Sequence, residues 1–197
     1  MGRWQPDARE RLEQAALDLF TEQGFAATTV PQIAARAGLT TRTFFRHFAD
    51  KREVIFAGEE LPQLAARLLA DAPAGLEPWA LVLTGLRTVA ETRFEGRREE
   101  FRRRWAVVAS DDSLRERDLR KRAAVAAAVR AGLVERGLDA VAAALLAETA
   151  GTVLQVALER WLAVGEERPL AEVIEETAST LVASLGPSSR EATDRDR

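Results

Sequence analysis

Signals that start and stop short helices dominate the first fifty residues of this chain. Asp7 and Thr29 each stand three residues before a Glu or Gln, which is the capping-box pattern of a helix N-terminus. A glycine closes the segment that each cap begins, and Thr40 then caps a third segment. The spacing predicts helices over 8–23 and 30–37 and a short one after Thr40. Helices this short are unstable alone, so they must pack together as one small domain.

The segment 30–49 contains no Asp or Glu, although the whole chain has 31 acidic residues against 28 Lys and Arg. A formal net charge of -3 repels nucleic acid if it is spread evenly. Binding to DNA therefore requires a local basic patch, and the acid-free segment supplies one.

A helix that starts at Thr41 divides its side chains between two sides, because successive residues are turned by about 100°. Phe44 and Phe48 fall on one side with Thr41 and Phe45 at its flank, and we expect this side to face the core. The opposite side carries Arg42, Thr43, Arg46 and His47. Alone, such a basic side also fits an ordinary solvated surface. The order of capped helix, glycine turn and basic helix favours a helix-turn-helix.

The rest of the sequence predicts an all-α chain. Tyrosine is absent and few windows alternate apolar with polar residues, as strands would. After a helix over 51–70, we expect further helices over 77–94, 97–109, 113–136, 139–164 and 169–185, which makes about nine in all. The polar tail 187–197 is predicted to be disordered.

Composition narrows the classes of activity. The chain has no cysteine and one histidine, His47, so no Cys-based or His-based metal site and no Ser-His-Asp triad is expected. We therefore predict no catalytic residues, no metal, no cofactor and no enzyme activity. The apolar run 140–147 is shorter than the roughly 20 residues that cross a bilayer, and no secretion leader is recognisable. These observations predict a cytoplasmic protein without membrane contact.

The N-terminal residues resemble the TetR family of transcriptional regulators. The matching positions are Thr28, Thr29, Val30, Ile33, Ala34, Ala37, Gly38, Thr43, His47, Phe48 and Lys51. The resemblance covers about the first 56 residues, and the segment GLTTRTFFRHF is similar to regulators common in actinobacteria. It implies a three-helix DNA-binding domain over 1–50, a linking helix over 51–70, and a ligand-binding and dimerisation domain over 51–186.

The resemblance also implies roles in DNA binding. Thr41, Arg42 and Arg46 would approach base edges, Thr29, Thr43, His47 and Lys51 would hold phosphates, and Gln32 could reach either. Two positions depart from the family pattern, since Phe45 replaces a usual tyrosine and Arg42 replaces a frequent glycine. Phe45 could touch sugar or a thymine methyl. His47 as a packing residue and Lys51 as a surface lysine remain alternatives.

The resemblance further implies a homodimer and a small-molecule effector. Helices 139–164 and 169–185 would form the dimer interface, and a dimer would bind palindromic double-stranded DNA. An apolar ligand cavity could be lined by Trp79, Leu83, Phe94, Phe101, Trp105 and Trp161, and the alternative is that these are plain core residues. Arg97, Arg98, Arg102, Arg103 and Arg104 form either a solvated face or a contact to an anionic headgroup, as in a fatty-acyl or acyl-CoA ligand.

The function predicted from the sequence is a homodimeric, ligand-responsive transcriptional regulator. We expect a repressor that a small hydrophobic effector releases from its operator. Two alternatives come from other classes: an architectural DNA-binding dimer without an effector, and a small helical ligand carrier or enzyme.

Overall fold

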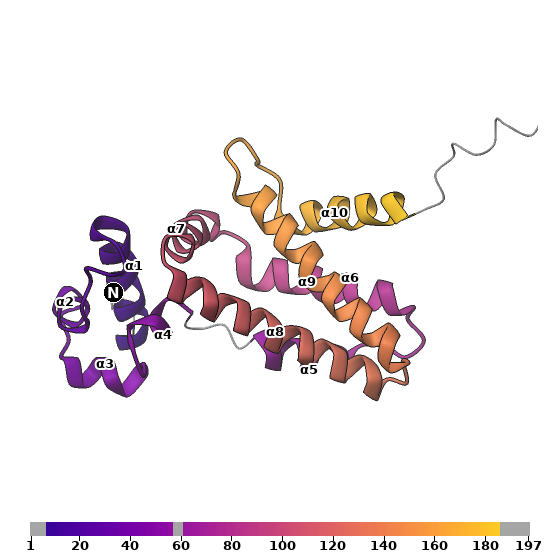
Figure 1. The fold of residues 1–197 in the computed structure, drawn as a ribbon, viewed down its shortest axis with the longest axis horizontal. Coiled ribbons are helices and arrows are strands. Elements are labelled where there is room, and N and C mark those ends of the chain that lie inside the picture. The colour runs from indigo at the N-terminus through magenta and orange to yellow at the C-terminus, as the bar shows by residue number, and fades with distance from the viewer. Residues whose placement is uncertain (1–6, 57–60, 186–197) are drawn as a thin grey trace, which may run out of the picture. The chain divides into compact units, whose positions relative to one another are not determined.

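The computed structural model describes residues 7–56 and 61–185, and within these ranges the chain is all-α with no strand (Figure 1). The elements are α1 (Ala8–Gln23), α2 (Val30–Arg36), α3 (Thr41–His47), α4 (Lys51–Ile55), α5 (Leu61–Asp71), α6 (Pro78–Val89), a π-helical segment η1 (Ala90–Phe94), α7 (Arg98–Ala109), α8 (Asp112–Glu135), α9 (Ala140–Leu162) and α10 (Leu170–Leu185). The predicted all-α fold class is therefore confirmed.

Two predicted helices differ in the structure. The segment 51–70 forms two helices, α4 and α5, and residues 57–60 between them lie outside the described ranges. Helix 77–94 is α6 continued by η1, in which each turn holds an extra residue. The predicted disordered tail 187–197 also lies outside the described residues.

Side-chain caps set the helix starts where the sequence signals place them. Asp7 accepts hydrogen bonds from the amides of the second and third residues after it, at 2.7 and 3.0 Å. Thr29 and Gln32 form a complete capping box at α2, and Asp50 caps α4 in the same manner as Asp7. These bonds satisfy amides that a helix start otherwise leaves without partners.

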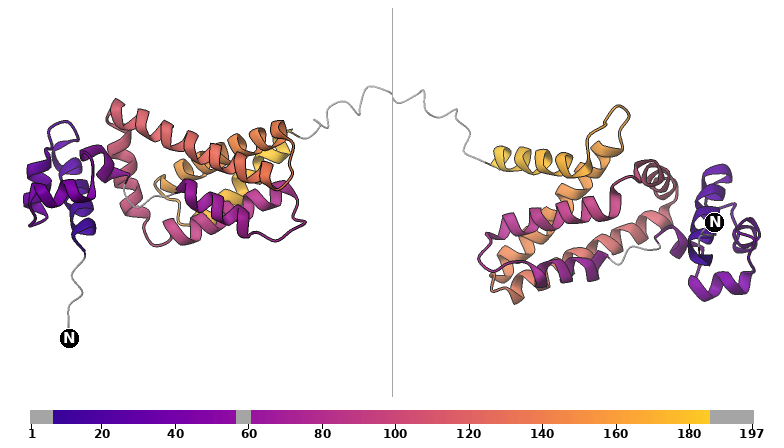
Figure 2. Two further views of the ribbon diagram at one scale, coloured as in Figure 1. Left: turned by 90° about the horizontal axis from the view of Figure 1, so that it is seen from below. Right: turned by 180° about the vertical axis from the view of Figure 1, so that it is seen from behind.

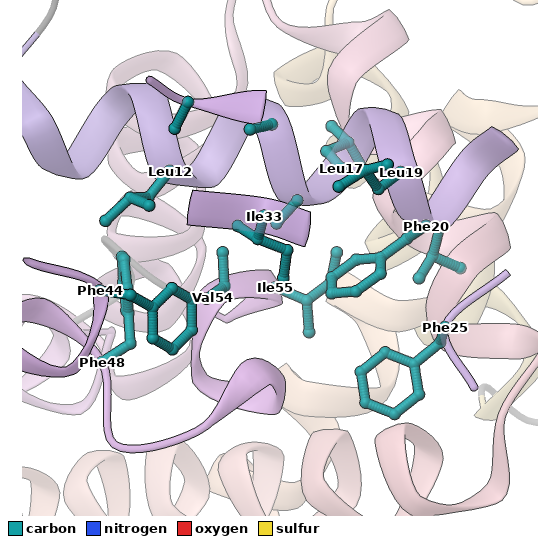
Figure 3. Close-up of a cluster of buried hydrophobic side chains, with 14 of the residues drawn as sticks. Leu12, Leu17, Leu19, Phe20, Phe25, Ile33, Phe44, Phe48, Val54 and Ile55 are labelled. Carbon is teal, nitrogen blue, oxygen red and sulfur yellow. The ribbon is translucent and has the colours of Figure 1, made fainter. Parts of the chain in front are cut away.

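The contacts divide the chain into two compact units. The first takes in the chain up to Arg67 together with Arg97–Ala128, and the second Leu68–Gly96 and the chain from Val129 onward. The core of the first unit is formed by side chains of the four helices α1 through α4 (Figure 3). It also includes Val107 of α7 and Leu114 of α8. Helix α7 and the start of α8 therefore pack with the N-terminal helices, although both follow the predicted domain boundary at residue 50 in the sequence.

The second unit is built on α6, α9 and α10, and α9 and α10 lie against each other (Figures 1 and 2). Among the described helices, α9 has the length and composition to cross a membrane, because few charges interrupt it, although the unbroken run 140–147 is short. Core helices of soluble proteins meet the same criterion. Only 28% of an 18-residue apolar stretch of α9 is buried, so no other described part of the chain covers much of this helix.

A network of ion pairs closes the loop between α9 and α10. Arg168 pairs with Glu166 at 2.7 Å and with Glu176 at 3.0 Å, and Glu176 also binds Arg160 at 2.7 Å. The hydrogen bond from Arg168 lowers the pKa of Glu166 from 4.5 to about 2. Because the pKa is lower in the folded state, this carboxylate stabilises the fold above about pH 4.5, and the contribution is lost as pH falls towards 2.

Arg168→Ala should therefore lower the melting temperature at neutral pH and have a smaller effect in acid. Thermal unfolding of the parent and the variant at pH 7 and near pH 3 checks this, with the difference shrinking at the lower pH. A difference that stays constant over this range contradicts the assigned role of the Glu166 charge.

Candidate nucleic-acid interface

A tight glycine turn joins α2 to α3. Gly38 has φ of 66°, and its amide and that of Leu39 bond back to Ala35 and Ala34 at 3.0 and 2.8 Å. This is the pattern of a Schellman cap, in which the residue after the helix adopts a left-handed conformation. The Arg11 guanidinium donates to the carbonyl of Ala37. A Cβ at position 38 would lie 2.9 Å from a nitrogen of this guanidinium. The bond between Arg11 and Ala37 joins residues 26 positions apart, so no local sequence pattern indicates it.

Two phenylalanines fix α3 on the domain. Phe44 is 0% exposed and Phe48 is 4% exposed, and their ring centroids are 5.5 Å apart within the core of the first unit (Figure 3). The predicted inward side of α3 is confirmed for these two residues. Their burial sets which side chains of α3 face outward.

The exposed face of α3 consists of Thr41, Arg42, Phe45 and Arg46. Phe45 is 58% exposed and touches Phe44 only edge-on, so it lies within this face, whereas we expected it at the flank of the core side. Thr43 and His47, predicted to face outward with the arginines, are half-buried. The outward face is thus turned by roughly one residue from the predicted one, because the core contacts of the helix are centred on Phe44.

Arg42 and Arg46 differ from the other arginines of residues 7–56. Arg9 pairs with Glu13, Arg11 binds the Ala37 carbonyl, Arg36 pairs with Glu22 and Arg52 pairs with Asp50. Within the described residues, no hydrogen bond or ion pair involves the side chain of Arg42 or Arg46. The two guanidinium groups are exposed, and the acid-free segment around them provides no counter-charge.

The predicted phosphate-binding polar residues of α2 and α3 have capping roles. The Gln32 Oε1 atom accepts from the Thr29 amide at 2.8 Å and from the Thr29 hydroxyl at 2.9 Å. The Thr43 hydroxyl lies 3.1 Å from that of Thr40, the cap of α3. These bonds hold the helix starts and engage the Oε1 atom of Gln32, and a DNA contact by Gln32 stays a prediction.

His47 lies at the edge of the exposed face, close to the start of α1. The pKa of Asp7 is lowered, chiefly by the hydrogen bond from the Glu10 amide, with a smaller contribution from His47. The Nε2 atom of His47 is shielded from solvent and has no hydrogen-bond partner in the described part of the chain. Its ring packs beside Phe48, at 6.2 Å between centroids, so packing accounts for part of its role.

Lys51 is engaged inside the domain. Its ammonium donates to the carbonyls of Phe25 and Thr28 at 2.8 and 2.9 Å and lies 4.3 Å from the centroid of the Phe25 ring. The ammonium therefore ties the start of α4 to the loop between α1 and α2. A phosphate contact by Lys51 stays a prediction, and the geometry adds a structural role that the sequence did not indicate.

Lys51→Met should lower the free energy of unfolding by about 1–3 kcal/mol, because the loop carbonyls lose their donor. Denaturant unfolding measures this change, and Arg52→Met is the control because its pair with Asp50 is at the surface. Unchanged stability, together with weaker binding to all DNA sequences, would instead identify Lys51 as a phosphate contact.

The six predicted ligand-lining residues are divided between the two units. Phe94 and Trp161 meet edge-on at 6.2 Å, and Trp79 packs against the core of the second unit, where Leu83 is partly buried. Phe101 and Trp105 belong to the first unit, where Arg97 and Arg122 lie over their rings. Their role in ligand binding remains a prediction.

The arginines of α7, together with Arg97 at its N-cap, bind protein groups. Arg97 pairs with Glu100, Arg102 with Glu99, and Arg103 with Asp18 of α1 at 2.6 Å, while Arg98 also has a partner. Arg104 is 8% exposed and donates to Glu100 and to the Ile55 carbonyl at the end of α4. The cluster therefore fastens α7 to the N-terminal helices, an arrangement that spacing along the sequence does not reveal.

Comparison with known proteins places this interface in a family. The family model "Bacterial regulatory proteins, tetR family" matches residues 13–57. The chain is 39% identical to TcmR, an HTH-type transcriptional regulator of Streptomyces glaucescens, over 41% of this chain and 36% of that protein. It is 38% identical to an HTH-type transcriptional repressor of Mycobacterium tuberculosis over 46% of this chain and 51% of that protein. It thus spans about a third to a half of the length of these curated relatives.

Solved structures extend the likeness to the whole fold. FadR of Thermus thermophilus, described as a TetR family transcriptional repressor in complex with lauroyl-CoA, is 26% identical with a TM-score of 0.52, covering 93% of this chain and 98% of that one. SmeT, the repressor of the Stenotrophomonas maltophilia multidrug efflux pump SmeDEF, has a TM-score of 0.60 at 21% identity, with 89% of each chain covered. SmeT has also been solved as a complex with triclosan.

Proposed function

Because this chain belongs to the TetR family of bacterial regulatory proteins, we propose that it is a homodimeric repressor that binds a palindromic operator and is released by a small hydrophobic effector. Its relatives are transcriptional regulators, not enzymes, and three of the proteins reported above are named as repressors. Binding DNA of the cell requires a cytoplasmic location, and we propose that location for this protein.

The observation that carries this proposal is the pair of free arginines on α3. Arg42 and Arg46 are exposed on a short helix that Phe44 and Phe48 hold in place, and the described residues offer them no acidic partner. Like charges four residues apart repel each other weakly, so the free protein gains nothing from this arrangement. A DNA duplex supplies the acceptors that both guanidinium groups lack.

A binding assay on selected DNA tests the proposal. Random duplexes are enriched on the full chain, and affinity for the enriched sequence is compared with that for a scrambled duplex at fixed salt. We expect specific binding at least a thousandfold tighter than non-specific binding. Equal affinity for both duplexes would refute sequence-specific regulation and favour the architectural alternative.

The open face of α9 supports a homodimer. Val141 is 67% exposed and Leu145 is 65% exposed on α9, and Val182 of α10 is 55% exposed. Exposed apolar side chains on neighbouring helices mark association surfaces. A four-helix interface with a second copy would cover this face, and two reading helices would then engage half-sites about one or more helical turns apart.

Leu145→Asp should convert the dimer into a monomer, because a second copy would have to bury the new carboxylate against apolar side chains. Light scattering at micromolar concentration measures the change in mass. Glu148→Asp keeps an acid at an exposed α9 position and should leave the dimer intact. A dimeric Leu145→Asp variant would show that α9 is not the interface.

The effector is proposed to be a fatty-acyl or acyl-CoA type molecule. Support comes from the FadR structure with lauroyl-CoA and from the apolar composition of α6 and α9. A ligand that binds only the folded protein raises its melting temperature. We expect such a shift with fatty acids or acyl thioesters, and the same ligand should weaken operator binding by roughly 5- to 150-fold through a coupling of about 1–3 kcal/mol.

The same two measurements, of the melting temperature and of DNA binding with and without ligand, also distinguish the two alternative functions. An architectural dimer would bind DNA equally with and without every ligand tested. A ligand carrier would show the thermal shift but no specific DNA binding.

A further inference from the structure

The outward face of α3 has a composition that points to particular bases. Two guanidinium groups, those of Arg42 and Arg46, stand one helical turn apart. Phe45 presents an apolar ring within the same face, since 58% of its surface is exposed. Thr41 completes the face with a small side chain.

Arginine distinguishes guanine from other bases because its parallel N–H groups match the O6 and N7 acceptors in the major groove. An arginine that already holds a carboxylate must first break that pair, and Arg36 and Arg52 are held in this way. Arg42 and Arg46 have no such pair in the described domain. They are therefore the arginines of residues 7–56 that are prepared for base contact.

Phe45 has no hydroxyl, so it cannot donate a hydrogen bond to a phosphate. Its exposed ring gains free energy only by covering an apolar group, and the C5 methyl of thymine is the apolar group of the major groove. Phe45 is adjacent to Arg46 along the helix and three residues from Arg42. A thymine bound by Phe45 therefore lies beside the guanine bound by Arg46.

The helix also sets the spacing between the two guanines. Four residues advance an α-helix by about 6 Å, and base pairs follow one another at about 3.4 Å. Arg42 and Arg46 thus reach bases about two steps apart when α3 lies along the groove.

Resting on the proposed function, we infer that each operator half-site contains two guanines two base-pair steps apart, with a thymine next to the guanine that Arg46 contacts. Arg42, Phe45 and Arg46 together determine this specificity, because they form the exposed face of α3 with Thr41.

Selection from random duplexes on the full chain should enrich this guanine and thymine pattern. Replacing either guanine by adenine should weaken binding about 5- to 150-fold. Replacing the thymine by deoxyuridine, which lacks only the methyl group, should weaken binding about fourfold.

Matched variants connect each base to its residue. Arg42→Ala should become insensitive to changes at one guanine, Arg46→Ala at the other, and Phe45→Ala to the loss of the thymine methyl. Arg130→Ala removes the same charge from an exposed position of α8 and should keep all three base preferences. If a variant fails to fold, 7-deazaguanine and deoxyuridine in the DNA test the same contacts with the parent protein.

Three outcomes are distinguishable. The base pattern with residue-matched losses supports the inference. Tight and specific binding that is indifferent to guanine N7 and to the thymine methyl overturns the inference and leaves the proposed function standing. Failure to enrich any sequence overturns the proposed function as well.

Discussion

Phe44→Ala should lower the free energy of unfolding by about 3–5 kcal/mol, the usual loss when a buried aromatic ring is truncated. Phe44 is 0% exposed and contacts the core that joins α1, α2 and α4 to Val107 and Leu114. Denaturant unfolding followed by helix content should show an earlier transition. The variant should also lose DNA binding, because α3 cannot hold its position without this ring.

The adjacent phenylalanine provides the matched control. Phe45→Ala removes a ring of the same size from an exposed position and should change stability by less than about 0.5 kcal/mol. Its effect should appear in DNA affinity instead. Similar losses of stability in both variants would mean that Phe45 is buried and that the outward face of α3 is assigned incorrectly.

Arg104→Met should cost about 3–5 kcal/mol of stability, because it removes one partner from a buried charged cluster. Arg104 donates to Glu100 at 2.9 Å and to the Ile55 carbonyl at 2.8 Å, and its guanidinium lies 3.7 Å from Glu13. Burial raises the pKa of Glu100, but the hydrogen bond from Arg97 and the charge of Arg104 lower it overall. Without Arg104, two carboxylates and a helix-end carbonyl lose their shared donor.

Arg102→Met is the control for this substitution. Arg102 pairs with Glu99 at the surface of the same helix, where such a pair contributes less than about 1 kcal/mol. Chemical unfolding of both variants measures the difference. An Arg104→Met variant as stable as Arg102→Met would show that the cluster does not hold α7 to the N-terminal helices.

Local signals account for the parts of the fold that the sequence predicted well. Asp7, Thr29 and Gln32 make the caps expected of them, and Gly38 adopts the left-handed conformation expected at the turn. Each of these features depends on residues within a few positions of one another. The break between α4 and α5 was missed although the sequence carries signals for it, since Gly58 and Pro62 interrupt the helical pattern over 51–70 and Pro62 falls in the first turn of α5.

The candidate interface was predicted by residue type more accurately than by orientation. Arg42 and Arg46 face outward as expected, whereas Thr43 and His47 are half-buried and Phe45 is exposed. A helix of seven residues can rotate by one position without violating its own hydrophobic pattern. The packing of Phe44 against the core chooses among these rotations, and that packing involves residues distant in sequence.

The sequence by itself determined the all-α class, the helix-turn-helix and the absence of acidic residues around the reading helix, because capping, periodicity and charge are local properties of the chain. Tertiary structure decided which arginines are free. Arg11, Arg103 and Arg104 bind partners 26, 85 and 49 residues away. Only folding brings such groups within hydrogen-bonding distance, and it leaves Arg42 and Arg46 available for DNA.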